Sequence, residues 1–194
     1  MAVLNESISL HEFNTTFTYN KRQPRDFFRG HAAASRDLLS AGTVLWKCAD
    51  FGISPSHKIS EWWIVRDHLT EVLRRCGGLG VSLQKYCRAR YAVIWEWRSA
   101  ASYLIEARLL QPVYGFSGQT APVDTRFSVR GQDTGLKNIT LIGGDPQLCI
   151  PDLTTLHIAQ ISCTPSDSLP PGWKTRGLPA MLHAPGTVVP GGRT

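Results

Sequence analysis

The chain has 194 residues, of which 42% are hydrophobic and 19% charged, so it can bury one sizeable core and is not disordered as a whole. No stretch approaches the roughly 18 to 20 apolar residues of a membrane-spanning helix, so we expect no such helix in this sequence. The formal net charge of +6 favours encounters with anionic partners such as nucleic acid or nucleotide phosphates.

The first third of the chain predicts strands at both of its ends and a short helix between them. Residues 7–10 and 13–19 alternate and are rich in threonine and aromatic residues, which is typical of short strands. Residues 31–40 contain the alanines and leucines of a short helix. Residues 43–49 and 59–65 then predict two strands that are apolar and aromatic.

The middle of the chain predicts helices. Residues 67–76 indicate one helix, ended by the glycine pair that begins at Gly77. Ser82 is a good helix N-cap, and neither glycine nor proline follows it until Pro112. Apolar residues in this segment recur at helical spacing, namely Leu83, Tyr86 or Cys87, Ile94, Trp97, Ala101, Leu104 and Ile105. We therefore expect a long central helix.

The second half of the chain predicts mainly strands. A short strand at 113–116 is followed by a polar, turn-rich segment at 119–135 that we expect to be a surface loop. Three further strands are expected at 138–142, 147–150 and 156–161.

The order of these elements predicts an α+β fold, not a repeating βαβ chain. It begins with an N-terminal strand and helices, continues through the long central helix, and ends in a half that is mostly strands. Residues 1–163 are expected to form a single domain. Residues 164–194 are rich in proline and glycine, so they predict an irregular tail.

Five cysteines are widely scattered and form no C-x-x-C pair, so we expect no metal site of the zinc-ribbon type. They fit reduced core residues in a cytosolic setting. Met1–Leu10 lacks the basic and apolar regions of a signal peptide. The protein is thus expected to be cytoplasmic as made, with export, where it occurs, by a route that reads no such signal.

One constellation of residues carries a family resemblance. Lys47 lies on an apolar strand, Ser60 precedes the aromatic pair Trp62 and Trp63, and Gln147 begins a late strand that ends at a proline. This pattern resembles the split NAD-binding cleft of the ADP-ribosyltransferase toxins. The resemblance implies a split sheet, NAD as substrate, and an immunity or target protein as partner.

The resemblance also implies a role for each residue. Lys47 would contact the phosphates of the dinucleotide, and Ser60 with Trp62 or Trp63 would form the nicotinamide pocket. Gln147 would orient the ribose or the acceptor. The chain departs from the family at two places, because Lys47 stands where arginine is usual and Gln147 where the catalytic glutamate is usual. Lysine lacks the bidentate phosphate contact of arginine, and glutamine lacks the negative charge that stabilises a cationic transition state.

A polar row on the expected central helix offers another candidate. Glu96, Ser99, Tyr103 and Glu106 follow one face at steps of three or four residues. Glu96 is a candidate acid/base, or an acidic group beside a ribose. It cannot pair with Glu106 as in a glycosidase, because ten helical residues span about 15 Å and such pairs lie within about 9.5 Å.

Two alternatives in other functional classes stay open. Arg66–Arg108 holds eight lysine or arginine residues and four carboxylates, so it carries most of the excess positive charge. A non-catalytic basic module that binds an anionic protein or nucleic acid would use this surface. A metal-independent ribonuclease would instead draw an acid/base pair from three histidines, assisted by Lys58. These histidines are His57, His68 and His157.

Overall fold

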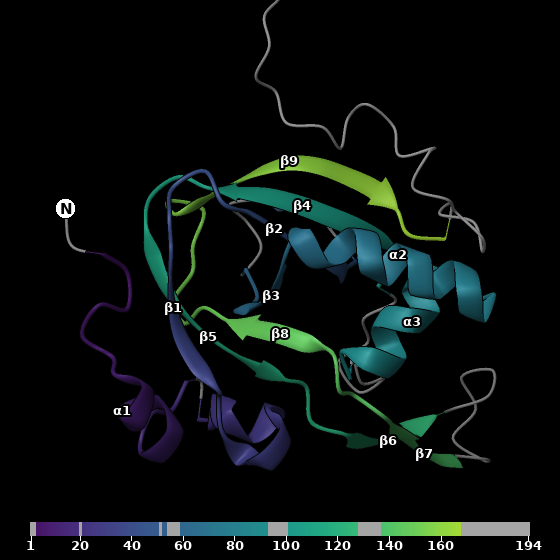
Figure 1. The fold of residues 1–194 in the computed structure, drawn as a ribbon, viewed down its shortest axis with the longest axis horizontal. Coiled ribbons are helices and arrows are strands. Elements are labelled where there is room, and N and C mark those ends of the chain that lie inside the picture. The colour runs from purple at the N-terminus through teal and green to yellow at the C-terminus, as the bar shows by residue number, and fades with distance from the viewer. Residues whose placement is uncertain are drawn as a thin grey trace, which may run out of the picture.

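The chain folds around one seven-stranded sheet (Figure 1). The structure, a computed structural model, describes residues 3–19, 21–50, 52–53, 59–92, 101–127 and 137–167, without the side chains of residues 125–127 and 137–139. The strands are β1 Ser35–Leu39, β2 Val44–Ala49, β3 Trp62–Val65, β4 Tyr103–Leu109, β5 Val113–Gln119, β6 Val123–Phe127, β7 Lys137–Leu141, β8 Pro146–Cys149 and β9 Ile158–Pro165. The helices are α1 Leu10–Thr15, α2 Asp67–Leu79 and α3 Leu83–Arg90, with short 3₁₀ turns at Pro24–Phe27 and Arg29–His31.

The sheet has the strand order β1-β5-β8-β3-β2-β4-β9, and all its neighbouring strands are antiparallel. It is strongly curved, so that β4 and β9 lie along one side of the molecule and β5 and β8 along the other (Figure 1). A separate hairpin of β6 and β7 projects beyond the start of β8 (Figure 1). The predicted α+β class is confirmed.

The sheet opens at its centre, between β2 and β3. β2 is hydrogen-bonded to β4 along its whole length, but its ladder with β3 stops at the pair Trp46↔Ile64. The first two residues of β3, Trp62 and Trp63, pair instead with β8, which lies along the opposite edge of β3. The last residues of β2, Lys47–Ala49, therefore diverge from β3, and this divergence positions the candidate site.

The core consists of three clusters. In one, α2 and α3 pack their apolar sides on Trp46, Ile64 and Leu104 of the central strands. A second is built around Trp63 and Ile105, with apolar residues of β2, β4, β5, β8 and β9. The third cluster joins the N-terminal segment to β5 and β8, and is built from Phe13, Phe28, Ala33, Phe116 and Cys149.

The expected long central helix is wrong. The helix that Ser82 caps ends at Arg90, and Tyr103–Leu109 is strand β4. β4 lies between two other strands and is buried on both faces, so its apolar residues form a run without alternation that helical spacing also fits. Glu106 interrupts this run as a buried charge, not as part of a solvated helical face.

Three further predictions of secondary structure are wrong. Leu10–Thr15, which overlaps the strands expected at 7–10 and 13–19, forms α1, because Ser9 accepts a hydrogen bond from the Glu12 amide and caps the helix. Ser35–Leu39 is strand β1 instead of a helix, since it pairs with β5 along its length. Val123–Phe127, within the expected surface loop, is strand β6.

Other elements agree with the sequence. The strands predicted at 43–49, 138–142 and 147–150 correspond to β2, β7 and β8. All five cysteines are free, and Cys76, Cys87 and Cys149 are buried as core residues, whereas Cys48 is partly buried and Cys163 is exposed. Within the described residues, no helix has the length and apolar character needed to cross a bilayer. Residues 168–194, most of the expected tail, lie outside the described part of the chain.

Candidate functional site

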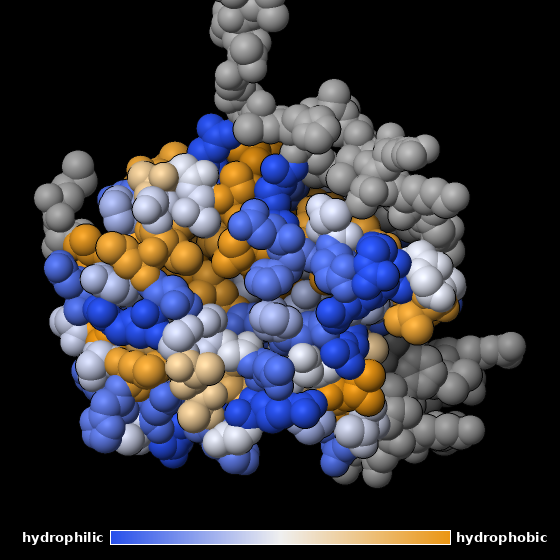
Figure 2. Space-filling view, in the orientation of Figure 1, coloured by the Kyte–Doolittle hydropathy of each residue, from blue (hydrophilic) through white to orange (hydrophobic). Residues whose placement is uncertain are grey.

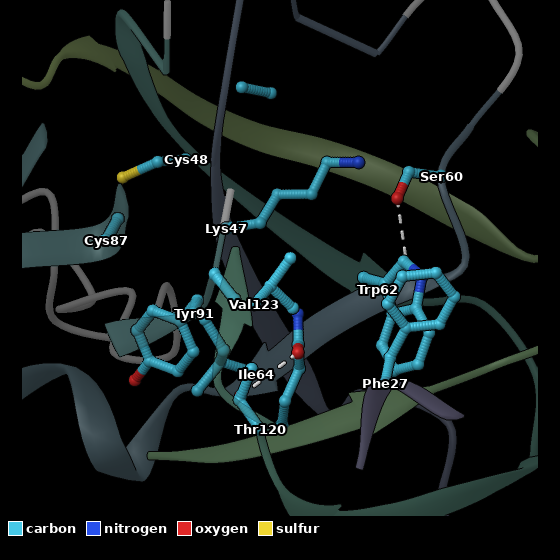
Figure 3. Close-up of a pocket in the computed structure, with 13 residues that line it drawn as sticks. Phe27, Lys47, Cys48, Ser60, Trp62, Ile64, Cys87, Tyr91, Thr120 and Val123 are labelled. Atoms are coloured by element: carbon cyan, nitrogen blue, oxygen red, sulfur yellow. Dashed lines mark hydrogen bonds between the residues drawn. The ribbon is translucent and has the colours of Figure 1, made fainter. Parts of the chain in front are cut away.

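A cavity of about 200 Å³ lies where β2 and β3 diverge (Figure 3). Strands β2, β3 and β8 and helix α3 contribute to its wall, together with the segments that follow β5 and precede β1. Most of the wall is apolar, and a few polar groups converge on it, which is the composition of a small-molecule site. Its polar lining residues are Lys47, Cys48, Ser60, Cys87, Tyr91, Thr120 and Gln147.

The structure brings four residues of the predicted constellation into this one cavity. Lys47 of β2, Trp62 of β3 and Gln147 of β8 line it together with Ser60. Trp63 does not line it, because alternation along β3 sends the ring into the core, where it is fully buried. Glu96 lies outside the described residues.

Lys47 supplies the positive charge of the cavity. Its side chain extends from β2 toward Ser60 (Figure 3), and its Nζ lies 4.5 Å from the centre of the Trp63 ring. Burial lowers the pKa of Lys47 from 10.5 to about 8, and the negative charge of Glu61 partly opposes this shift. The ammonium is thus mainly protonated at pH 7, and the face of the Trp63 ring is its neighbour.

Ser60 and Trp62 form the part of the cavity wall toward which the Lys47 side chain extends. The Ser60 Oγ accepts a hydrogen bond from the Trp62 amide at 3.2 Å, so the hydroxyl keeps its own proton for another acceptor. The Trp62 ring meets Phe27 and Phe28 edge-on, with centroids 5.5 and 5.4 Å apart. These contacts hold the indole in place as a wall of the cavity.

Gln147 enters the cavity from β8 and contacts Thr120. The Thr120 Oγ1 lies 3.2 Å from the Gln147 side-chain amide and 3.0 Å from the main-chain oxygen of Asp145. Thr120 is only 2% exposed, so it lies beneath Gln147 in the wall. The described residues that line the cavity include no carboxylate.

Sequence reasoning missed several lining residues. Thr120 forms an isolated β-bridge with Phe28 directly after β5, whereas Phe27 lies in a 3₁₀ helix and Tyr91 at the end of α3. No spacing in the chain relates these residues to Lys47. Cys48 is the one lining residue next to Lys47 in the sequence that could have been predicted with it, because both lie where β2 diverges from β3.

The surface around α2 and α3 carries arginines that are engaged in ion pairs. Hydrophilic side chains gather over α2 (Figure 2). Arg74 and Arg75 both bind Glu71, with distances of 2.7 and 2.8 Å. Arg90 binds the buried carboxylate of Asp145. Each of these three arginines is therefore already engaged by a carboxylate.

The predicted histidine pair is not assembled at the cavity. His68 lies at the start of α2, and neither it nor His157 is a lining residue. The His157 Nδ1 instead lies 2.9 Å from the Thr154 hydroxyl. His57 and Lys58 lie outside the described residues.

Comparison with models of protein families finds no match, and neither does comparison with curated protein sequences. Two solved structures are similar to the chain. One is described as Rhs1-CT in complex with its cognate immunity protein RhsI1, with a TM-score of 0.42 and 15% identity over 68% of this chain and 80% of that one. The other is described as Tne2 in complex with Tni2, with a TM-score of 0.40 and 10% identity over 68% of this chain and 92% of that one. Since both TM-scores are below 0.5, the chemistry of this chain has to be deduced from its own cavity.

Proposed function

We propose that the cavity binds the nicotinamide end of NAD and that the protein cleaves the bond between nicotinamide and ribose. One observation supports this more than any other. Lys47, Ser60, Trp62 and Gln147, chosen for their resemblance to an NAD-binding cleft, line a single cavity at the opening of the sheet. They come from the neighbouring strands β2, β3 and β8 or from the residues next to them.

Each lining group suits one part of the dinucleotide. The Lys47 ammonium provides a point charge for a phosphate, and the Trp62 indole provides a face on which the nicotinamide ring stacks. The Ser60 hydroxyl has its proton free for the carboxamide oxygen of nicotinamide. Gln147 contacts a hydroxyl group of the adjoining ribose.

The proposed reaction balances without a further cofactor. The bond from ribose C1′ to the nicotinamide nitrogen breaks, and its electron pair neutralises the pyridinium as nicotinamide leaves. Water or an acceptor nucleophile then forms a bond to C1′ and loses one proton. ADP-ribose is released or transferred, so the two outcomes, hydrolysis and ADP-ribosyl transfer, share every step up to the departure of nicotinamide.

The wider role that we propose is that of a toxin or effector domain neutralised by an immunity protein. The resemblance carried by Lys47, Ser60 and Gln147 implies this role, since the family that it concerns consists of toxins. Growth arrest of bacterial cells that express the chain, together with a fall in their NAD content, is the expected result. Cells that express the Lys47→Ala variant should grow normally.

The first test is thermal unfolding with and without NAD. At a concentration one hundred times its Kd, a ligand of the folded state adds about 2.7 kcal/mol to stability. For a chain of this size, that shift corresponds to a rise in Tm of about 5 to 10 °C. Lys47→Ala and Gln147→Ala should remain folded, lose this rise, and release nicotinamide at least tenfold more slowly than the wild type.

A matched control removes charge without touching the cavity. Lys85 is exposed on α3, so Lys85→Ala lowers the net charge as Lys47→Ala does but should keep the response to NAD. The proposal fails if NAD at millimolar concentration leaves Tm unchanged, or if Lys47→Ala responds like the wild type. Oligonucleotide binding with a steep salt dependence, in place of a response to NAD, would instead support the basic binding module.

A further inference from the structure

The hydroxyl of Thr120 lies between two groups that both present an oxygen to it. The main-chain oxygen of Asp145 is 3.0 Å away, and the amide oxygen of Gln147, as placed in the structure, is 3.2 Å away. The same Asp145 oxygen accepts the Thr120 main-chain amide at 3.0 Å. A carbonyl oxygen has two lone pairs, so it can accept from both the amide and the hydroxyl of one residue.

A hydroxyl carries one proton, and it therefore cannot donate to both oxygens in full. The main-chain oxygen of Asp145 is an acceptor only, whereas the side chain of Gln147 offers an acceptor at one end and a donor at the other. If the Thr120 proton points to Asp145, the Gln147 amide has to present its NH₂ group to the lone pair of Thr120. In that arrangement both close contacts are hydrogen bonds, and no two oxygens face each other without a proton.

We infer that Thr120 is a positioning residue that holds the NH₂ group of Gln147 against the wall and directs its carbonyl oxygen into the cavity. The side-chain oxygen and nitrogen of glutamine are alike in shape, so hydrogen bonding decides their orientation. Among the described residues, the NH₂ group of Gln147 has no other hydrogen-bond partner. This orientation therefore breaks no other hydrogen bond. The cavity thus presents an acceptor at Gln147 in addition to the cation at Lys47.

The orientation has a chemical consequence that rests on the proposed function. An amide oxygen directed into the cavity accepts a hydrogen bond from a ribose hydroxyl. It also turns the negative end of the amide dipole toward the carbon that becomes cationic as nicotinamide leaves. Gln147 would then perform, with a partial charge, part of the task of the glutamate that is usual in the resembling family.

The Asp145 main chain, which anchors Thr120, is itself fixed from the helical side. The Asp145 carboxylate accepts the Tyr86 hydroxyl at 2.6 Å and Arg90 Nε at 2.9 Å, so α3 determines where the Asp145 peptide lies. Helix α3 therefore helps to determine the orientation of the Gln147 amide, through Asp145 and Thr120.

Hydrogen exchange of the Gln147 side chain, followed by NMR on protein labelled with ¹⁵N-glutamine, tests the orientation without any ligand. The Gln147 NH₂ signal is identified by its loss in Gln147→Glu. Its protons should exchange at least fivefold faster in Thr120→Val, which lacks the acceptor, and at the wild-type rate in Thr120→Ser. Equal exchange in the wild type and Thr120→Val would overturn the inference.

A second measurement covers the case in which Thr120→Val does not fold. In the wild-type protein, the Gln147 NH₂ protons should show nuclear Overhauser effects to the Thr120 side chain. Their absence, with effects to cavity residues such as Trp62 instead, contradicts the proposed orientation.

Turnover of NAD tests whether this orientation of Gln147 matters for the proposed reaction. Thr120→Val should lower kcat about tenfold with little change in KM, and Thr120→Ser should restore it, because only the hydroxyl orients Gln147. If the NMR result is as expected and no form of the protein consumes NAD, the orientation stands and the proposed function fails. If Thr120→Val keeps the kcat of the wild type, Thr120 has no role in the reaction.

Discussion

Lys47 carries the positive charge of the cavity, and burial makes this charge titrate close to neutral pH. Its pKa falls from 10.5 to about 8 because the ammonium is partly removed from water. Below pH 8 the folded protein therefore holds a charge that its surroundings disfavour. Between about pH 8 and 10.5 the unfolded chain binds more protons than the folded one, so the contribution of Lys47 to stability rises with pH.

Binding of NAD should depend on pH with the opposite sign. Only the protonated ammonium attracts a phosphate, so the Kd for NAD should rise about tenfold between pH 7 and pH 9 as Lys47 loses its proton. Lys47→Arg removes the titration, because arginine stays charged over this range. Calorimetric titration at each pH measures Kd. An equal increase in the wild type and Lys47→Arg would show that another group is responsible.

Two glycines in different elements show how packing decides the effect of one methyl group. Gly78 lies in α2, and a Cβ added there meets nothing within 4 Å. Gly115 lies in β5, where an added Cβ would be 2.7 Å from Leu148 Cδ1 and 3.3 Å from Ile150 Cγ1. Both of these neighbours are buried core residues that have little room to move.

Alanine at the two positions should therefore change stability in opposite directions. Gly78→Ala should stabilise the protein by about 0.5 to 1 kcal/mol, because alanine loses less backbone entropy in a helix. Gly115→Ala should destabilise it by about 1 to 3 kcal/mol through overpacking against β8. Chemical denaturation measures both free energies of unfolding. A stabilised Gly115→Ala variant would contradict the close packing of β5 on these side chains.

At the scale of the molecule, Asp145 joins the helical layer to the strands that carry the cavity. It is 1% exposed and precedes β8, and its carboxylate is shared by Arg75 of α2 and by Tyr86 and Arg90 of α3. The helices pack on one part of the sheet, so this cluster fixes their position relative to β8 and Gln147. The loss of a buried acceptor leaves several donors without a partner at once.

Asp145→Ala should therefore be among the costly substitutions, with a loss of about 3 to 5 kcal/mol in the free energy of unfolding. Asp145→Asn keeps an acceptor for Tyr86 and should lose distinctly less. Urea denaturation of the two variants gives the comparison. A loss below about 1 kcal/mol in Asp145→Ala would mean that water replaces the cluster without difficulty.

The sequence predicted the strands that carry the site better than it predicted the helices. β2 and β8 were predicted close to their bounds, because each is a short apolar segment with clear breaks. β4 was mistaken for helix, since a strand with neighbours on both sides has no alternation to reveal it. The charge of Glu106 added to this error, because its partners Arg66 and Ser162 are distant in the chain.

By itself, the sequence determined the α+β class, the helix cap at Ser82, and the residue types that suit an NAD-like ligand. Only the tertiary structure decided which of these residues meet. Strand alternation shows that Trp62 and Trp63 face opposite sides, but the divergence of β2 from β3 decides that Trp62 faces the cavity. Thr120 was beyond prediction for the same reason, because a hydrogen bond between residues 27 positions apart depends on how β5 and β8 pair, and pairing is a property of the assembled sheet.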